Sequence, residues 1–372
     1  MQPKFLISGG GTGGHIFPAV AIADALKKSF PEAGFLFVGA LGRMEMEKVP
    51  EAGYTIEGLW ISGLQRKLTL QNLSFPLKVT ASLLKARSII NRFKPDVVIG
   101  TGGYASGPTL RVASSKGIPT LILEQNSFPG ITNKLLAAKV DKICVAYEGM
   151  ERWFPAAKVV LTGNPVRKEI QLLAEGADLR TKALNHFGLS AEKKTILVIG
   201  GSLGARTINM SIEGQLKAIK ESGVQLLWQT GKSFYSQAKA SVEKNNHQSV
   251  KAFAFIKEMD LAYAAADLVI SRAGAIAISE LCIAGKPSIL VPSPNVAEDH
   301  QTKNAKALVE KQAAIMVKDS SANESLINEA LELIYNTERL NTLHTNIANL
   351  AKPFAIAQIT SEIISLLNKE KQ

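Results

Sequence analysis

The sequence is poor in cysteine and has no long apolar run. Its two cysteines, Cys144 and Cys282, lie in apolar surroundings, and no histidine and cysteine cluster accompanies either. Disulfide frameworks and zinc sites need several such residues, so we expect both thiols to be buried in a reducing cytoplasm. No stretch of about 18 apolar residues occurs, which argues against a membrane span. Gly9, Gly10 and Gly11 interrupt the first apolar run, which argues against a secretory signal.

Acidic residues are absent from one long segment. None occurs between Glu57 and Asp96, and the cations of this segment are Arg66, Lys67, Lys78, Lys85, Arg87, Arg92 and Lys94. The whole chain has a net charge of +11, and residues 1–163 carry 19 Lys/Arg against 11 Asp/Glu, a net +8. A one-sided basic surface fits nucleic acid, anionic lipid or a phosphorylated substrate. Aromatic residues that could stack on bases are sparse, so the pattern disfavours nucleic acid.

The acid-free segment has the pattern of a helix with one basic face. Lys78, Lys85 and Arg92 recur every seven residues and therefore share that face. Apolar residues crowd the entrance of this helix, among them Leu68, Leu70 and Phe75. Two interpretations fit the pattern equally. One is the solvated face of an ordinary amphipathic helix, and the other is an interfacial membrane site in which Lys and Arg ring apolar anchors.

Three glycine-rich turns, at residues 8–15, 100–108 and 200–206, are the most informative feature of the chain. The first and third follow a short apolar run and lead into a helical stretch. Glycines allow close approach of the backbone, and the N–H groups of the following helix favour an anion. We therefore expect a diphosphate ligand at one or both of these turns.

Apolar runs alternate with helical stretches along the chain. This alternation predicts an α/β protein with two Rossmann-like domains, whose parallel sheets face each other across a cleft. We place the domains at 1–163 and 164–352, with a C-terminal helix at about 353–372 packing back on the first. The predicted strands are 4–8, 35–38, 97–99, 120–123, 142–145, 195–199, 224–229, 250–253, 268–271, 288–291 and 314–317. The predicted helices include 18–28, 77–93, 108–116, 132–137 and 355–367, with Pro18 in the first turn of the first one.

The first turn also matches a dinucleotide-binding fingerprint. Gly9, Gly11 and Gly14 have the spacing Gly-x-Gly-x-x-Gly. A nicotinamide enzyme should in addition have an acid at the end of its second strand, for the ribose hydroxyls. That strand ends at Gly39 and Ala40, so we interpret the turn as serving chemistry other than hydride transfer.

Two residues beside the turns are candidates for chemistry. His15 stands at a helix start, where the helix dipole favours the neutral ring, so it is a candidate general base; it could instead satisfy a backbone group. Glu280 lies in an otherwise apolar helix that follows a glycine turn. A buried acid usually has a partner, and a carboxylate can accept two sugar hydroxyls. The polar segment 292–305, at a strand end, is the predicted ligand loop.

Taken together, these motifs resemble the MurG-type N-acetylglucosaminyltransferases of bacterial cell-wall synthesis. The matching segments are 9–15 with Pro18, 100–108, 124–126, 163–167, 200–206, 229–232, 272–280 and 299–305. The resemblance implies a two-domain glycosyltransferase of the B type. It implies transfer of N-acetylglucosamine from UDP-N-acetylglucosamine to the lipid-linked muramyl-pentapeptide, lipid I, to form lipid II.

The resemblance also implies roles for particular residues. In the first domain, it implies that Thr12, Gly13, Gly14 and Asn126 face the transferred sugar and the acceptor, with the loop residues Gly102, Gly103 and Tyr104 beside them. On the donor side, in the second domain, it implies Arg167, Ser202, Ile256, Ala275, Ile276, Ala277, Ile278, Ser279, Glu280 and Gln301. Glu280 would bind the ribose and Ile256 the uracil, and Gly201, Gly204 and Ala205 would contribute backbone N–H groups to the diphosphate. The membrane-facing patch of the family corresponds to residues 66–94.

The implied mechanism is one inverting displacement, with His15 as the first candidate for the base and Glu124 as the second. No Asp-x-Asp pair stands at a strand end, so we expect no obligatory bound metal. We expect no cofactor. The expected partners are both substrates, an anionic membrane surface and other cell-wall enzymes, at the cytoplasmic face of the bacterial plasma membrane. The alternatives are a UDP-N-acetylglucosamine 2-epimerase and a non-catalytic nucleotide-sugar-binding subunit.

Overall fold

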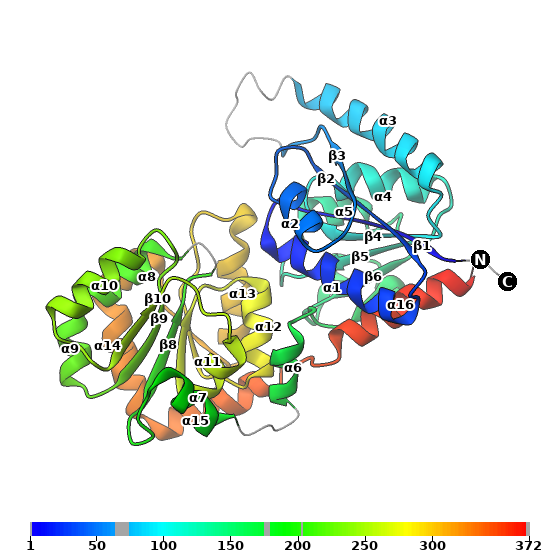
Figure 1. Ribbon diagram of the computed structural model, residues 1–372. Helices are drawn as coiled ribbons and strands as arrows, with labels where there is room; N and C mark the ends of the chain where they lie inside the picture. The colour runs from blue at the N-terminus through cyan, green and yellow to red at the C-terminus, as the bar shows by residue number, and fades with distance from the viewer. Residues whose placement is uncertain (1, 64–73, 175–178, 202–203, 370–372) are drawn as a thin grey trace. The chain divides into compact units, whose positions relative to one another are not determined.

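The computed structural model describes residues 2–63, 74–174, 179–201 and 204–369. The chain divides into two compact units (Figure 1). The first unit comprises Met1–Pro165 with Phe354–Gln372, and the second comprises Val166–Pro353. The division thus falls two residues after the one expected from the sequence, because the turn that contains Asn164 still bonds to the first unit: the Asn164 Nδ2 donates to the Gln125 carbonyl over 3.1 Å.

The first unit is built on a seven-stranded parallel sheet of order β3-β2-β1-β4-β5-β6-β7. Its strands are β1 (Lys4–Gly9), β2 (Gly34–Ala40), β3 (Ile56–Leu59), β4 (Val97–Gly102), β5 (Thr120–Glu124), β6 (Lys142–Val145) and β7 (Val159–Leu161). Its α-helices are α1 (Gly13–Ser29), α2 (Glu45–Glu51), α3 (Phe75–Phe93), α4 (Ser106–Ser115), α5 (Ile131–Leu136) and α16 (Ala355–Lys369). Short 3-10 helices are η2 (Met150–Arg152) and η3 (Ala156–Lys158).

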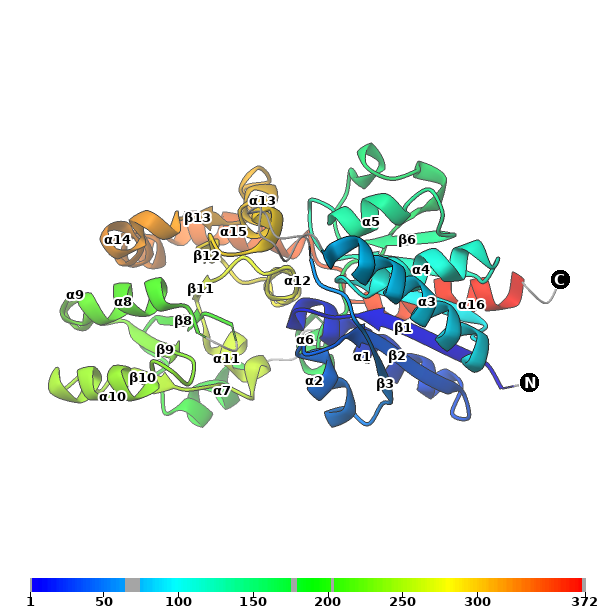
Figure 2. The same cartoon turned by 90° about the horizontal axis from the view of Figure 1, so that it is seen from above.

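Helices cover both faces of this sheet (Figure 2). Successive side chains of a strand point to opposite faces, so β1 contributes to two cores. Phe5 and Ile7 belong to the core that includes α1 and α16, whereas Leu6 belongs to the core that includes α3 and α4. The C-terminal helix α16 packs on α1 through this first core. Burial on both faces is the reason why these strands are short continuous apolar runs.

The second unit has a six-stranded parallel sheet of order β10-β9-β8-β11-β12-β13. Its strands are β8 (Thr195–Ile199), β9 (Gln225–Gln229), β10 (Val250–Phe253), β11 (Leu268–Ser271), β12 (Ser288–Leu290) and β13 (Ile315–Met316). Its helices are α6 (Lys168–Ala174), α7 (Arg180–Phe187), α8 (Arg206–Gly214), α9 (Leu216–Glu221), α10 (Tyr235–Lys244), α11 (Met259–Ala265), α12 (Ala275–Ile283), α13 (His300–Val309), α14 (Ala322–Tyr335) and α15 (Thr337–Ala348), with the 3-10 turns η4 (Ala297–Asp299) and η5 (Asp319–Ser321). Ile196 and Val198 of β8 pack with α8 and α14 in one core.

Each sheet has a point at which the strand order reverses. In the first unit β1 lies between β2 and β4, and in the second unit β8 lies between β9 and β11. Loops that leave adjacent strands in opposite directions open a crevice at the carboxyl ends of those strands, where α/β proteins bind ligands. The three glycine turns follow β1, β4 and β8, so all of them lie at these reversal points.

Helix α1 and strand β3 both differ from the sequence prediction. Helix α1 begins at Gly13, so Pro18 lies inside the helix and not in its first turn. Proline cannot donate a hydrogen bond to the carbonyl four residues earlier, which made the later start the natural prediction. Strand β3 was not predicted from the sequence. Only Leu59 among its residues is fully buried, and Glu57 interrupts the apolar pattern.

Among the described residues, no helix has both the length and the apolar composition that spanning a bilayer requires.

Candidate active site

The first two glycine turns interlock within the first unit. The Gly10 N–H donates to the Gly102 carbonyl over 3.1 Å. Gly103 has φ +92°, and a Cβ there would stand 2.4 Å from the Gly10 carbonyl oxygen. Gly102 has φ +102°, and a Cβ there would stand 2.8 Å from the ring of His15. Glycine is required at both positions, because any side chain would separate the two turns.

His15 occupies the first turn of α1, with its ring against Gly102. Its Nδ1 lies 2.8 Å from the Gly10 carbonyl oxygen. A carbonyl only accepts, so Nδ1 carries the proton and the Nε2 of the neutral ring is the acceptor. Burial lowers the pKa of His15, and this effect exceeds the opposing effects of the Gly10 hydrogen bond and the charge of Glu45. The ring is therefore neutral near pH 7 and able to take up a proton at Nε2.

Glu124 ends β5 and organises the loop that follows. Its Oε1 accepts the backbone N–H of Asn126 at 3.1 Å and the Asn126 side-chain amide at 3.2 Å. Its Oε2 accepts the Gly130 N–H at 3.0 Å and the Asn133 amide at 2.8 Å. Burial raises the pKa of Glu124, and these four hydrogen bonds oppose it. The carboxylate thus has loop donors on both oxygens and positions Asn126, which makes it a less accessible base than His15.

The remaining residues expected on the acceptor side lie around the same reversal point. Thr12 is exposed at the N-cap of α1, and Gly13 and Gly14 form the first turn of that helix. Tyr104 is 45% exposed, and a Cβ on Gly63 would stand 2.2 Å from its ring. These residues follow β1 and β4, which are adjacent in the sheet, so the fold brings them to one edge.

In the second unit, Arg167 and Glu280 form a bidentate ion pair. The Arg167 Nε and one terminal nitrogen donate to the two Glu280 oxygens at 2.8 and 2.9 Å, and the Tyr263 hydroxyl donates to Glu280 at 3.1 Å. The Glu280 side chain is 6% exposed, whereas that of Arg167 is 45% exposed. Burial lowers the pKa of the guanidinium, but the bonds to Glu280 outweigh this and leave it raised. The buried acid therefore has partners within the chain, and one of them is another expected donor residue.

The third glycine turn is held by the end of β9. Gly201 and Gly204 both have φ +80°, and a Cβ on Gly204 would stand 2.1 Å from the Thr230 carbonyl oxygen. The Gln229 side chain donates to the Gly201 carbonyl over 3.2 Å and accepts the Ile256 N–H at 2.9 Å. Gln229 thus connects two expected donor-site residues, a role that its place in the motif did not reveal. Ala205 is the N-cap of α8. Ser202 lies outside the described residues.

The loop after β12 and the start of α12 complete this edge of the second unit. The Gln301 side chain accepts the Ser293 N–H at 2.8 Å and so shapes the polar loop. Ala275, Ile276, Ala277, Ile278 and Ser279 belong to α12 with Glu280, beginning directly after Gly274.

An acid that the sequence analysis missed supports this loop. Asp319 accepts hydrogen bonds from Arg272 and, at 3.0 Å, from the Thr207 hydroxyl at the start of α8. Arg272 also donates to the Val291 carbonyl over 3.0 Å. Asp319 follows β13 without any motif, so the sequence contained no signal for it.

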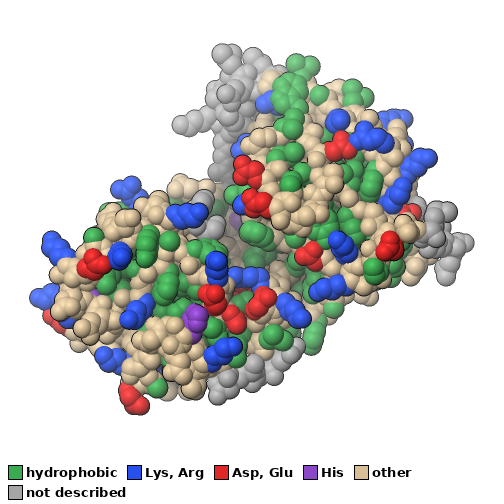
Figure 3. Space-filling view, in the orientation of Figure 1, with side chains coloured by type: hydrophobic (Ala, Val, Ile, Leu, Met, Phe, Trp, Pro, Cys, Tyr) green, Lys and Arg blue, Asp and Glu red, His purple; other side chains and the backbone are tan. Residues whose placement is uncertain are grey.

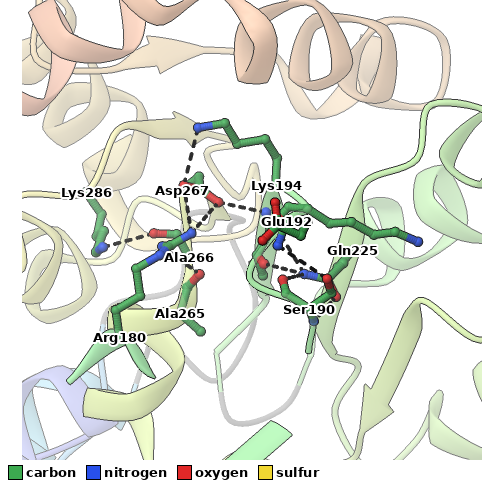
Figure 4. A network of polar contacts seen from close by, with 11 residues as sticks. Arg180, Ser190, Glu192, Lys194, Gln225, Ala265, Ala266, Asp267 and Lys286 are labelled. Atoms are coloured by element: carbon green, nitrogen blue, oxygen red, sulfur yellow. Dashed lines mark hydrogen bonds and ion pairs between the residues drawn. The ribbon is translucent and has the colours of Figure 1, made fainter. Parts of the chain in front are cut away.

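A second polar network (Figure 4) lies at the amino-terminal ends of strands β8 and β11 of the same sheet. Asp267 accepts two hydrogen bonds from Arg180 at 3.2 Å and one from the Thr195 N–H at 2.8 Å, which joins the starts of β8 and β11. Burial, aided by the charge of Arg180, lowers the pKa of the nearby Lys286 to about 8. Perturbed pKa values often mark active sites, but this lysine is remote from the carboxyl edge and donates to the Ala266 carbonyl, so its role is structural.

Within the basic segment, residues 75–93 form α3, whose exposed side chains are a mixture of cationic and apolar groups (Figure 3). Leu77 and Leu84 are 67% and 66% exposed. The Lys78 ammonium lies 5.8 Å from the centre of the Trp60 ring. Lys85 and Arg92 both pair with Glu57 of the unpredicted strand β3, so an acid adjoins a surface that is acid-free in sequence. Phe75 begins the helix; Leu68 and Leu70 lie outside the described residues.

Each of the two α/β units has a parallel sheet, with glycine turns at the point where its strand order reverses. This is the architecture of a two-domain glycosyltransferase. Family models agree: the glycosyltransferase family 28 N-terminal domain matches residues 5–145, and the family 28 C-terminal domain matches residues 195–359. The chain belongs to glycosyltransferase family 28, and it is a glycosyltransferase. This confirms the predicted enzyme class and the predicted pair of α/β domains with parallel sheets.

Individual relatives are similar over their whole length. A protein of Cytophaga hutchinsonii is 57% identical over 372 residues, covering 99% of this chain and 98% of that protein. One of Parabacteroides distasonis is 56% identical over 367 residues, covering 99% of both. Each bears the name UDP-N-acetylglucosamine–N-acetylmuramyl-(pentapeptide) pyrophosphoryl-undecaprenol N-acetylglucosamine transferase. The crystal structure of Acinetobacter baumannii MurG is 28% identical, with a TM-score of 0.79 and coverage of 98% of this chain and 99% of that one.

A crystal structure of UDP-N-acetylglucosamine 2-epimerase is also similar, with a TM-score of 0.64 and coverage of 100% of this chain and 98% of that one. Its sequence identity is 14%, so this likeness shows the fold alone.

Proposed function

We propose that this chain transfers N-acetylglucosamine from UDP-N-acetylglucosamine to the muramyl sugar of lipid I, with inversion, and so forms lipid II. The observation that carries the proposal is the 57% identity over 99% of the chain to a transferase named for these substrates. The described residues of both units fit it, since each unit supplies one part of the chemistry.

The first unit supplies the base. The acceptor hydroxyl gives its proton to Nε2 of His15 as its oxygen attacks the anomeric carbon, and the bond from that carbon to the diphosphate breaks. The bond between His15 and the Gly10 carbonyl supports this role, because it holds the ring in the tautomer that accepts at Nε2. Thr12, Gly13, Gly14 and Asn126 are the proposed contacts for the acceptor, together with Tyr104.

The second unit supplies the donor site. The N–H groups of Gly201, Gly204 and Ala205, with the start of α8, would stabilise the charge that develops on UDP as it leaves. Glu280 would accept the ribose hydroxyls while Arg167 holds its carboxylate in place. Ile256 and Gln301 are the proposed contacts for the remainder of the nucleotide sugar.

A product assay tests the function directly. Purified protein receives UDP-N-acetylglucosamine with or without a lipid-diphosphate muramyl-peptide acceptor. We expect UDP release and a disaccharide product only when the acceptor is present. A 2-epimer formed without acceptor would indicate the isomerase, and nucleotide binding with no product under either condition would indicate a non-catalytic subunit.

Gln229→Met should weaken donor binding. The change preserves size but removes both hydrogen bonds, and it leaves the buried Ile256 N–H unpaired, which costs about 1–3 kcal/mol. We expect the dissociation constant for UDP-N-acetylglucosamine to rise about tenfold, measured by calorimetry. Gln237→Met is the matched control, because that glutamine is exposed on α10 and its side chain donates to the surface residue Glu213. Equal affinities of the two variants would contradict the role of Gln229.

We propose that the protein acts at the cytoplasmic face of the plasma membrane, as a peripheral protein that uses α3. The tail of the acceptor cannot leave the bilayer easily, because exposing each CH₂ group costs about 0.8 kcal/mol. Exposed Leu77 and Leu84 beside the cations of α3 have the composition of an interfacial site. Phe75, Leu68 and Leu70 are the proposed apolar anchors before them.

Changing Lys78, Lys85 and Arg92 together to Gln should release the protein from anionic vesicles. Each cation near such a surface contributes about 1 kcal/mol, and salt screens this attraction. Sedimentation with vesicles at low and high salt measures the effect, and activity on a short-tailed, water-soluble acceptor should persist. The control variant changes Lys217, Lys239 and Lys244 of the second unit, which removes the same charge. If both triple variants bind vesicles alike, α3 is only a solvated face.

A further inference from the structure

Glu45, the first residue of α2, is a buried acid that neither the motifs nor the proposed mechanism uses. Its side chain is 1% exposed, although carboxylates are almost never fully buried unless they are paired. The next acid on the same helix, Glu47, is exposed. A buried carboxylate loses hydration, so its environment must supply hydrogen bonds in return.

Two backbone N–H groups supply those bonds, and they come from two different strand ends. The Glu45 Oε2 accepts the Gly11 N–H at 2.8 Å, in the turn after β1. The Oε1 accepts the Ala40 N–H at 3.0 Å, at the end of β2. Glycines make the room: a Cβ on Gly10 would stand 2.1 Å from Oε1, and a Cβ on Gly39 would stand 2.5 Å from the Glu45 Cγ.

The same turn holds His15. The Gly10 carbonyl accepts from Nδ1 of the ring, and the next residue, Gly11, is the one that Glu45 holds. The Gly10 N–H is in turn bonded to the Gly102 carbonyl. Gly11 has φ +85°, and a Cβ added there would meet nothing within 4 Å, so no neighbour packs against that side of the residue. Glu45 therefore ties this turn to the end of β2, as Gly102 ties it to β4.

We propose that Glu45 is a positioning residue for the base: it fixes the turn formed by Gly10 and Gly11, and through the Gly10 carbonyl it fixes the orientation and tautomer of His15. This inference rests on the proposed role of His15 as the base. Glu45 acts through His15 and the glycine turn, with no contact to the reacting atoms. Its loss should therefore lower kcat and leave the donor site of the second unit unaffected.

The test is a double-mutant cycle of Glu45→Gln with His15→Asn, and Glu47→Gln is the matched control. An amide presents an NH₂ group to one of the two N–H donors, so the turn is released on one side. We expect Glu45→Gln to lower kcat about 10–100-fold, with KM for UDP-N-acetylglucosamine within about twofold of wild type, since small displacements of a catalytic group have effects of this size. In the His15→Asn background it should lower kcat no further.

Each outcome separates the hypotheses. An additional loss of kcat in the His15→Asn background, or a wild-type kcat for Glu45→Gln, overturns the positioning role. Wild-type turnover by His15→Asn alone overturns the base, and absence of transfer by the wild-type protein overturns the proposed function. Thermal melting verifies the fold of each variant. If Glu45→Gln melts below the assay temperature, Glu45→Asp, which keeps the charge on a shorter side chain, enters the same cycle.

Discussion

His15→Asn should lower turnover by about 10²–10⁴-fold, the usual contribution of a general base. Asparagine can still donate to the Gly10 carbonyl, as Nδ1 of the histidine does, so the glycine turn keeps its hydrogen bond. What the variant lacks is the acceptor at Nε2. Steady-state kinetics with both substrates measure the loss, and the dissociation constant for UDP-N-acetylglucosamine should not change, because the proposed contacts for the nucleotide belong to the second unit.

The pH dependence of kcat provides an independent check of the same base. Burial lowers the pKa of His15 from its ordinary 6.5. The ring is an effective base only when it is neutral, so activity should be full above about pH 6.5 and should fall as the pH drops through the lowered pKa of the folded protein. Near wild-type turnover by His15→Asn would show that the histidine is structural, and Glu124→Gln would then be the next variant.

Glu280→Gln should raise the dissociation constant for UDP-N-acetylglucosamine by about 5–150-fold, which corresponds to about 1–3 kcal/mol for a charge-assisted hydrogen bond. The amide lacks the negative charge that we propose accepts the ribose hydroxyls, and it also loses the bidentate pair with Arg167. The value of kcat at saturating donor should change less than the affinity. Calorimetric titration measures the effect, and Glu169→Gln, which neutralises an exposed acid on α6, is the control.

A comparison of UDP with 2′-deoxy-UDP makes this test specific for the ribose. The wild-type protein should bind UDP more tightly than 2′-deoxy-UDP. The Glu280→Gln variant should discriminate less between the two nucleotides, because it lacks the carboxylate that would accept the 2′-hydroxyl. Thermal melting of the variant reports separately on the lost ion pair. Unchanged donor affinity in a folded variant would show that Glu280 serves only to hold Arg167.

Local features of the fold followed directly from the sequence. The strand, glycine turn and helix after residue 4 and after residue 195 are encoded within about twenty residues each, since apolar runs and glycines act on the neighbouring backbone. For the same reason β6, β8, β10 and β11 have the predicted bounds. The expectation that Glu280 has a partner was also local, because it depends only on an acid in an apolar helix.

Contacts that depend on the pairing of distant strands could not be predicted from the sequence. Glu45 meets Gly11 only because β2 lies beside β1, and Gly102 meets His15 only because β4 lies on the other side. Likewise Glu57 reaches Arg92 through the edge strand β3, whose half-exposed residues conceal it from a search for apolar runs. The sequence by itself determined where the glycine turns lie, and it predicted which of them approach an anion and which residues are candidates for chemistry. Only the tertiary structure decided which side chains hold these turns and candidate residues in place. Those contacts depend on strand order, and strand order leaves no periodic signal in the chain.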